Sequence, residues 1–153
     1  MTPAARRGLL ALTAVVALAA VGAAVFTQQA WDMQPCPWCV LQRLIFVAIA
    51  GAALLGLLWP TGGAVLAGLL ALSGLAAALW QHFVAASAES CDLTLADRIM
   101  AATGLDGRFP EVFMAMTTCA DGKVDLFGLP YETWSGTLFA LMALAMVAVL
   151  RRR

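Results

Sequence analysis

Charged residues avoid three long stretches of the chain. None occurs in residues 8–31, 44–88 or 133–150, and the middle stretch is interrupted only by the breaker Trp59-Pro60-Thr61-Gly62-Gly63. A helix needs about 20 mostly apolar residues to cross a bilayer. In lipid its backbone polar groups must be satisfied internally, and these stretches do not alternate as barrel strands would. The pattern therefore predicts membrane-spanning helices at residues 8–26, 40–58, 64–84 and 134–150.

The first of these segments has two interpretations. Arg6 and Arg7 precede it, an arrangement that also opens a secretory signal peptide. The apolar region of a signal peptide runs for about 7–15 residues and ends at a small-residue cleavage site. This segment is longer and no clear cleavage site follows it, so we expect it to be retained as a helix.

The basic residues predict how the chain lies in the membrane. Arg6 and Arg7 flank the first span, and Arg151–Arg153 follow the last one. Basic residues favour the cytoplasmic side, which places both termini there and the loops 27–39 and 85–133 outside. The longer loop carries eight acidic and three basic residues, which suits the outer face. Within it, residues 94–103 and 109–116 have apolar side chains at mixed helical spacing. This pattern suits short amphipathic helices on a membrane surface, or alternatively side chains that pack locally under the loop.

Composition narrows the class of protein. Hydrophobic residues make up 63% of the 153 residues and charged residues only 12%, whereas soluble domains carry about 25% charged residues. Nine basic residues balance nine acidic ones, so there is no basic patch for nucleic acid. The expected fold is an all-α membrane protein. It forms a single domain over residues 1–153, an up-down bundle of four helices in contact with membrane lipid.

All four cysteines fall on the predicted outer side. Cys36 and Cys39 lie at the start of the second span, and Cys91 and Cys119 lie in the long loop. Structural disulfides suit an oxidising compartment, and a disulfide from Cys91 to Cys119 would stabilise the loop. A Cys₄ zinc site is a further alternative, although the spacing of the second pair is unusual for one. A disulfide within a C-x-x-C motif closes too short a loop to contribute much stability, and such pairs are typically redox-active. The motif therefore favours a redox-active pair at Cys36 and Cys39.

The residues around this pair support reactivity. Pro37 suits the first position of a helix, which makes Cys36 the N-cap and places Cys39 in the first turn. The helix N-terminus favours thiolates at both positions. Arg43 lies one turn below Cys39 on the same face, where it could stabilise a thiolate and a developing anionic oxygen on an acceptor. Alternatively, Arg43 is an interfacial anchor.

These motifs resemble those of the DsbB family, the bacterial inner-membrane quinone reductases that form disulfide bonds. The matching residues are the C-x-x-C-x-x-x-R motif that runs from Cys36 to Arg43, then Phe109-Pro110-Glu111-Val112-Phe113, Cys119-Ala120 and Asp125-Leu126-Phe127-Gly128-Leu129. The related vitamin K epoxide reductase-like enzymes also use four cysteines and a quinone. Their loop pair precedes the C-x-x-C motif, whereas here it follows, which favours the DsbB family.

The resemblance implies a protein-disulfide:quinone oxidoreductase in the inner membrane, with periplasmic cysteines. Its partner would be a DsbA-like thioredoxin-fold protein, whose thiolate attacks a Cys91–Cys119 disulfide at Cys91. Cys119 would pass the electrons to Cys36–Cys39 through a Cys36–Cys119 bond. Cys39 would then reduce the cofactor, a ubiquinone or menaquinone, without a metal. His82, the only histidine, would help to bind the quinone by resemblance, although a histidine at a span end is also commonly just a polar end residue.

Two other functions fit the sequence. The chain could be a non-catalytic scaffold with four spans and structural disulfides, or a DsbB paralogue that serves a dedicated partner. Thiol trapping separates a catalyst from a scaffold, because only catalytic cysteines exchange with a partner and respond to quinone.

Overall fold

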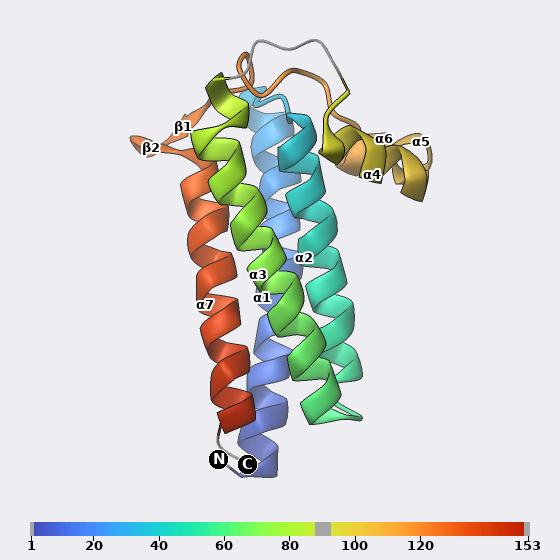
Figure 1. The fold of residues 1–153 in the computed structure, drawn as a ribbon, viewed down its shortest axis with the longest axis vertical. Coiled ribbons are helices and arrows are strands. Elements are labelled where there is room, and N and C mark those ends of the chain that lie inside the picture. The colour runs from blue at the N-terminus through green and yellow to red at the C-terminus, as the bar shows by residue number, and fades with distance from the viewer. Residues whose placement is uncertain (1, 88–92, 152–153) are drawn as a thin grey trace.

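The structure is a computed structural model that describes residues 2–87 and 93–151. Within these residues four long helices form an up-down bundle (Figure 1), namely α1 (Pro3–Trp31), α2 (Pro37–Leu55), α3 (Pro60–Phe83) and α7 (Tyr131–Arg151). Each is long and apolar enough to cross a membrane. The predicted all-α membrane fold is confirmed. Both termini lie at one end of the bundle, the terminal end, and the long loop lies at the other, the loop end.

The helix bounds differ from those expected from hydropathy. Helix α1 begins at Pro3 rather than residue 8, and α3 begins at Pro60 rather than residue 64. Helix α2 begins at Pro37 and ends at Leu55, whereas the prediction was 40–58. Proline occupies the first turn of all three helices, where its fixed φ suits the helix and its missing N–H costs nothing. Helix starts are therefore set by proline and caps, which an average of hydropathy does not detect.

Small residues bring α3 close to its neighbours. A Cβ atom added at Gly74 would lie only 2.4 Å from the ring of Phe139 on α7. That ring stacks on Phe46 of α2, with centroids 4.1 Å apart. The fully buried side chains of Leu10, Ile49 and Met146 extend the same core along the bundle. Leucines on the outer faces of the spans, such as Leu12, Leu54 and Leu144, are exposed, as expected for lipid-facing positions.

Short helices of the long loop pack beside the start of α2 (Figure 1). After the one-turn η1 (Ala85–Ser87) and the undescribed residues 88–92 come α4 (Leu95–Thr103), α5 (Leu105–Arg108) and α6 (Pro110–Phe113). A capping box between Thr94 and Asp97 begins α4, which confirms the helix predicted at 94–103. The helix predicted at 109–116 is present only as α6, because the chain becomes extended at Met114 and Met116 donates its N–H to the Pro35 carbonyl.

A small hairpin, not predicted from the sequence, leads into α7. Strands β1 (Asp125–Leu126) and β2 (Leu129–Pro130) pair antiparallel. Phe127 and Gly128 between them have φ of 54° and 80°, the left-handed values that a two-residue hairpin turn requires. The Trp134 indole donates to the Leu126 carbonyl at 3.0 Å, which ties the hairpin to α7.

Candidate active site

The N-terminus of α2 holds two cysteine sulfurs together. Cys36 is the N-cap and Pro37 is the first helical residue, as the sequence predicted. The Cys39 backbone N–H donates to the Cys36 Sγ at 3.3 Å, and the two Sγ atoms are 2.6 Å apart. Cys36 is buried, whereas Cys39 is partly exposed. One helix start therefore places both sulfurs on the same side, with only Cys39 facing open space.

Cys119 from the long loop joins this pair. It packs against the buried cluster that contains Cys36 and Trp38, and the Cys36 side chain and the Trp38 backbone both shift its pKa downward. The hydrogen bond with Cys36 is the main cause that lowers the pKa of Cys119, against the opposing effect of burial. The same hydrogen bond raises the pKa of Cys36. In this three-sulfur cluster (Cys36, Cys39 and Cys119), the thiolate form is therefore more favoured at Cys119 than at Cys36.

The fourth predicted site cysteine lies outside the described residues. Cys91 falls within residues 88–92, so its position relative to Cys119 is not part of the structure. Its assignment to a loop disulfide stays a prediction.

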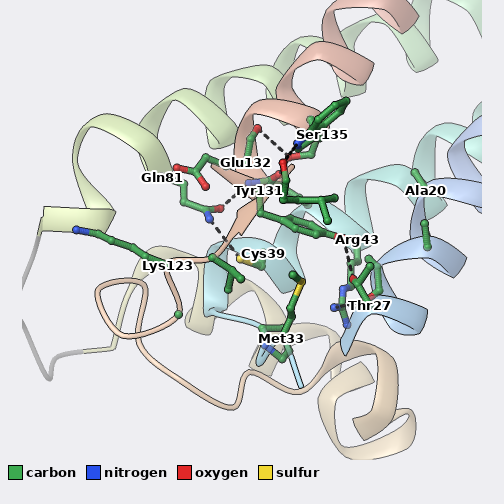
Figure 2. Close-up of a pocket in the computed structure, with 18 of the residues that line it drawn as sticks. Ala20, Thr27, Met33, Cys39, Arg43, Gln81, Lys123, Tyr131, Glu132 and Ser135 are labelled. Atoms are coloured by element: carbon green, nitrogen blue, oxygen red, sulfur yellow. Dashed lines mark hydrogen bonds between the residues drawn. The ribbon is translucent and has the colours of Figure 1, made fainter. Parts of the chain in front are cut away.

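Two amide side chains and a hydroxyl group form a line of hydrogen bonds that ends at Cys39. Gln81 on α3 donates an N–H to the Cys39 Sγ at 3.2 Å (Figure 2). Gln42 on α2 in turn donates to the Gln81 carbonyl oxygen at 2.7 Å. The Ser135 hydroxyl on α7 donates to the carbonyl oxygen of Gln42. Sequence reasoning missed Gln81 and Ser135 as site residues. The available signal was that Gln42 and Gln81 are polar residues within otherwise apolar spans.

A cavity of about 190 Å³ lies beside Cys39, between α1, α2 and α7. Apolar side chains form much of its wall, among them Ala20, Ala23, Phe46 and Leu138. Polar side chains also line it, among them Thr27, Gln42, Arg43, Tyr131 and Ser135. An apolar slot with a few convergent polar groups is typical of a small-molecule site. The donor set fits a flat apolar ring that carries oxygen atoms, such as a quinone.

Arg43 lines this cavity and is only 6% exposed. Its Nη1 donates to the Gln28 side chain at 2.8 Å and to the Val112 carbonyl at 3.0 Å, and its Nη2 donates to the Ala24 carbonyl at 3.3 Å. Arg43 thus connects α1, α2 and α6. Within the described residues it forms no hydrogen bond with Cys39. A guanidinium has five N–H donors, so further donors remain for a molecule in the cavity.

His82 does not form part of the cavity wall. Its ring is exposed, and its Nδ1 lies 2.9 Å from a carboxylate oxygen of Glu132, which does line the cavity. The structure therefore brings Arg43 to the cavity beside Cys39 and connects His82 to it only through Glu132. The neighbouring Gln81 takes the inward position instead.

The chain is similar to known disulfide bond formation proteins over nearly its whole length. The family model described as "Disulfide bond formation protein DsbB" matches residues 6–149. Disulfide bond formation protein B 1 of Pseudomonas syringae pv. syringae is 34% identical, over 94% of this chain and 88% of that protein. Disulfide bond formation protein B of Alkalilimnicola ehrlichii is 33% identical, over 97% and 95%, and that of Cupriavidus metallidurans is 30% identical, over 93% and 91%. The chain therefore belongs to the DsbB family of disulfide bond formation proteins.

Proposed function

We propose that the chain re-oxidises a DsbA-like, thioredoxin-fold dithiol protein and transfers the electrons to a membrane quinone. In the net reaction the partner dithiol becomes a disulfide, and the quinone takes up two electrons and two protons to become the hydroquinone. The observation that carries this proposal is the position of the three-sulfur cluster, which joins a loop cysteine on one side to the cavity on the other. A structural disulfide would need neither neighbour.

The first thiol exchange is proposed at the loop pair. A thiolate of the partner attacks Cys91 in a Cys91–Cys119 disulfide, which forms a mixed disulfide and releases Cys119 as a thiolate. The lowered pKa of Cys119 supports its role as a leaving group and then as a nucleophile. The second partner thiolate then breaks the mixed disulfide. The partner is released in its oxidised form, and Cys91 remains as a thiolate.

The second exchange is proposed within the three-sulfur cluster. The Cys119 thiolate attacks Cys36 in a Cys36–Cys39 disulfide, which forms a Cys36–Cys119 bond and releases Cys39 as a thiolate. The contact between Cys119 and Cys36 supports Cys36 as the sulfur attacked. Cys91 then attacks Cys119, which restores the loop disulfide and leaves Cys36 and Cys39 as a dithiol.

The cavity beside Cys39 is proposed as the quinone site. A bound quinone supplies the acceptor for the electron pair and protons of the dithiol. All four of the following residues line the cavity: Phe46 and Leu138 would offer apolar contact to a ring, while Arg43 and Tyr131 would donate hydrogen bonds to its oxygen atoms. A fixed positive charge at Arg43 would favour negative charge that develops on such an oxygen.

The proposed location is the bacterial inner membrane, with cytoplasmic termini and periplasmic cysteines. Arg6, Arg7 and Arg151 lie at the terminal end of the bundle, which is the side that the positive-inside rule assigns to the cytoplasm. The start of α2, which carries Cys36 and Cys39, lies at the loop end, and the cavity lies beside Cys39.

The test is quinone absorbance after mixing the purified protein with a reduced thioredoxin-fold partner and a quinone. We expect quinone reduction that depends on Cys36 and Cys39. The Cys91→Ala variant should lose reduction driven by the partner. It should keep reduction driven by a small dithiol, because the Cys36–Cys39 pair is intact. A scaffold with structural disulfides would leave the quinone unchanged in every arm, and that outcome would contradict the proposal.

A further inference from the structure

A buried line of hydrogen bonds crosses three helices and ends at Cys39. It runs from Ser135 on α7 to Gln42 on α2, then to Gln81 on α3, and then to the Cys39 sulfur. Gln42 and Gln81 are only 4% and 7% exposed, although they lie among mostly apolar side chains. Buried amides are costly unless their groups are hydrogen bonded. These two satisfy one another, which makes the line a built feature of the site.

Every hydrogen bond in this line points the same way. The Ser135 hydroxyl donates to the Gln42 oxygen, the Gln42 amide donates to the Gln81 oxygen, and the Gln81 amide donates to the sulfur. The positive end of each dipole therefore faces Cys39. An N–H donated to sulfur stabilises the anionic form, which is the reactive one. A side-chain amide does this without an acidic proton of its own.

Gln42 does not touch the sulfur, yet it controls the group that does. The N–H₂ group and the oxygen of a side-chain amide are nearly equal in size, so packing alone does not fix which of them faces a given neighbour. A hydrogen bond to one of the two groups fixes the orientation of both. Gln42 donates to the oxygen of Gln81 at 2.7 Å and thereby turns the N–H₂ of Gln81 toward Cys39. Arg43 does not replace this contact, since its described hydrogen bonds go to Gln28, Val112 and Ala24.

We propose that Gln42 is a positioning residue that fixes the direction of the Gln81 amide, so that Gln81 donates to the Cys39 sulfur and keeps it reactive. The effect on turnover rests on the proposed function, because it assumes that Cys39 delivers electrons to the acceptor. The effect on the reactivity of Cys39 does not depend on any acceptor. The two can therefore fail separately.

The decisive variant is Gln42→Glu. A carboxylate accepts hydrogen bonds but does not donate them, so the oxygen of Gln81 loses its partner. The new carboxylate then attracts the N–H₂ of Gln81, which turns the oxygen of Gln81 toward the sulfur. Gln42→Met keeps a similar length and only frees the Gln81 amide. Gln29→Glu is the matched control, because it makes the same change at an exposed position of α1 near the loop end.

The measurement is the rate at which iodoacetamide alkylates Cys39 at pH 8 in the fully reduced, full-length protein, resolved by mass spectrometry. We expect a decrease of about tenfold to a hundredfold for Gln42→Glu, the range of one hydrogen bond to a charged group. Gln42→Met should show a smaller decrease of roughly threefold, and Gln81→Met, which removes the donor itself, a decrease as large as that of Gln42→Glu. Gln29→Glu should match the wild type.

Alkylation of Cys39 within twofold of wild type in both Gln42 variants overturns the proposal, even if Gln81→Met is slow. Where Gln42→Glu does not fold, the other two variants test the proposal. Alkylation should then be slowest in Gln81→Met, intermediate in Gln42→Met and fastest in the wild type, and any other order contradicts the proposal. The kcat for quinone reduction should fall in parallel with alkylation. If the wild-type protein reduces no quinone, the proposed function fails, and the alkylation series still tests the role of Gln42.

Discussion

Under the proposed function, the interaction between Cys36 and Cys119 favours Cys119 as the attacking sulfur of the cluster. The hydrogen bond from Cys36 is the largest cause that lowers the pKa of Cys119, and burial opposes it. A lowered pKa means that the Cys119 thiolate persists to a lower pH than for an ordinary cysteine, whose pKa is about 8.5. Protonation then removes the reactivity as the pH falls through this lowered value. The lowered pKa is therefore consistent with the proposed role of Cys119 as a nucleophile.

Replacing Cys36 by alanine should shift the reactivity of Cys119 to higher pH. Without the Cys36 donor, burial still disfavours the thiolate, so Cys119 needs a more alkaline solution to ionise. The measurement is the pH dependence of Cys119 alkylation in the reduced protein. Cys39→Ala is the control and should cause no upward shift, because the charge of Cys39 opposes ionisation of Cys119. An unchanged profile in Cys36→Ala would show that the contact between the two sulfurs is unimportant.

Arg43 should affect the acceptor rather than the partner. Arg43→Ala removes a buried charge from the cavity wall, and we expect the KM for quinone to rise by about tenfold or more. Arg43→Lys keeps the charge but loses the planar set of donors, so it should restore only part of the affinity. The measurement is steady-state quinone reduction over a quinone series, beside an assay of the mixed disulfide at Cys91. That mixed disulfide should form at a nearly unchanged rate.

Arg108→Ala serves as the control, because it removes an exposed arginine from α5. It should leave the KM for quinone unchanged. If Arg43→Ala also retains the wild-type KM, Arg43 acts only through Gln28, Ala24 and Val112 as an anchor of α6. The acceptor site would then lie elsewhere.

Part of the site was readable from the sequence because it is local. Cys36, Cys39 and Arg43 lie within one helix start, so spacing alone places them together. Gln81 and Ser135 reach Cys39 and Gln42 from two other helices, and no spacing in the chain encodes which faces of α3 and α7 meet α2. The position of His82 could not be predicted for the same reason. His82 and Gln81 are neighbours on α3, and only the packing of α3 against α2 determines which of the two faces Cys39.

At the level of helices, Gly74 sets the distance between α3 and α7. A methyl group at this position would overlap the Phe139 ring, and that ring is held by its stacking on Phe46. We expect Gly74→Ala to lower the free energy of unfolding by about 1–3 kcal/mol, as for overpacking in a core. Thermal unfolding in detergent measures the change.

A matched substitution and a second-site change complete this test. Gly51→Ala on α2 places its Cβ in open space and should be neutral or slightly stabilising. Adding Phe139→Leu to Gly74→Ala should recover part of the loss, because the smaller side chain makes room. Equal unfolding temperatures for Gly74→Ala and Gly51→Ala would show that the helices move apart without cost.

The elements differ in how far the sequence predicts them. The four spans follow from long apolar runs, and α4 follows from its capping box and helical spacing. The hairpin of β1 and β2 pairs too few residues to leave a periodic pattern. Its formation depends on left-handed values at Phe127 and Gly128 and on the bond from Trp134, which are tertiary features. The end of α6 is likewise set by contact between Met116 and Pro35.

For the whole molecule, the proposed orientation predicts accessible cysteines on one side only. A membrane-impermeant thiol reagent applied to intact cells with reduced protein should label the cysteines at the loop end. A cysteine introduced at Ser87 is the positive control there, and one introduced at Thr61, at the terminal end of α3, should be labelled only after the membrane is opened. Labelling in the reverse order would contradict cytoplasmic termini.

The three-sulfur cluster and the cavity lie at the same end of the bundle, and this position determines whether turnover responds to the membrane potential. Moving one elementary charge across the membrane costs or yields about 2.3 kcal/mol per 100 mV. Under the proposed function, thiol protons and electrons pass from Cys36 and Cys39 to an acceptor at the same depth, so no net charge crosses the bilayer. Turnover in proteoliposomes should therefore be independent of the membrane potential, with equal rates before and after an ionophore collapses it. Disulfide formation by this chain would neither draw on nor add to the electrical energy of the cell.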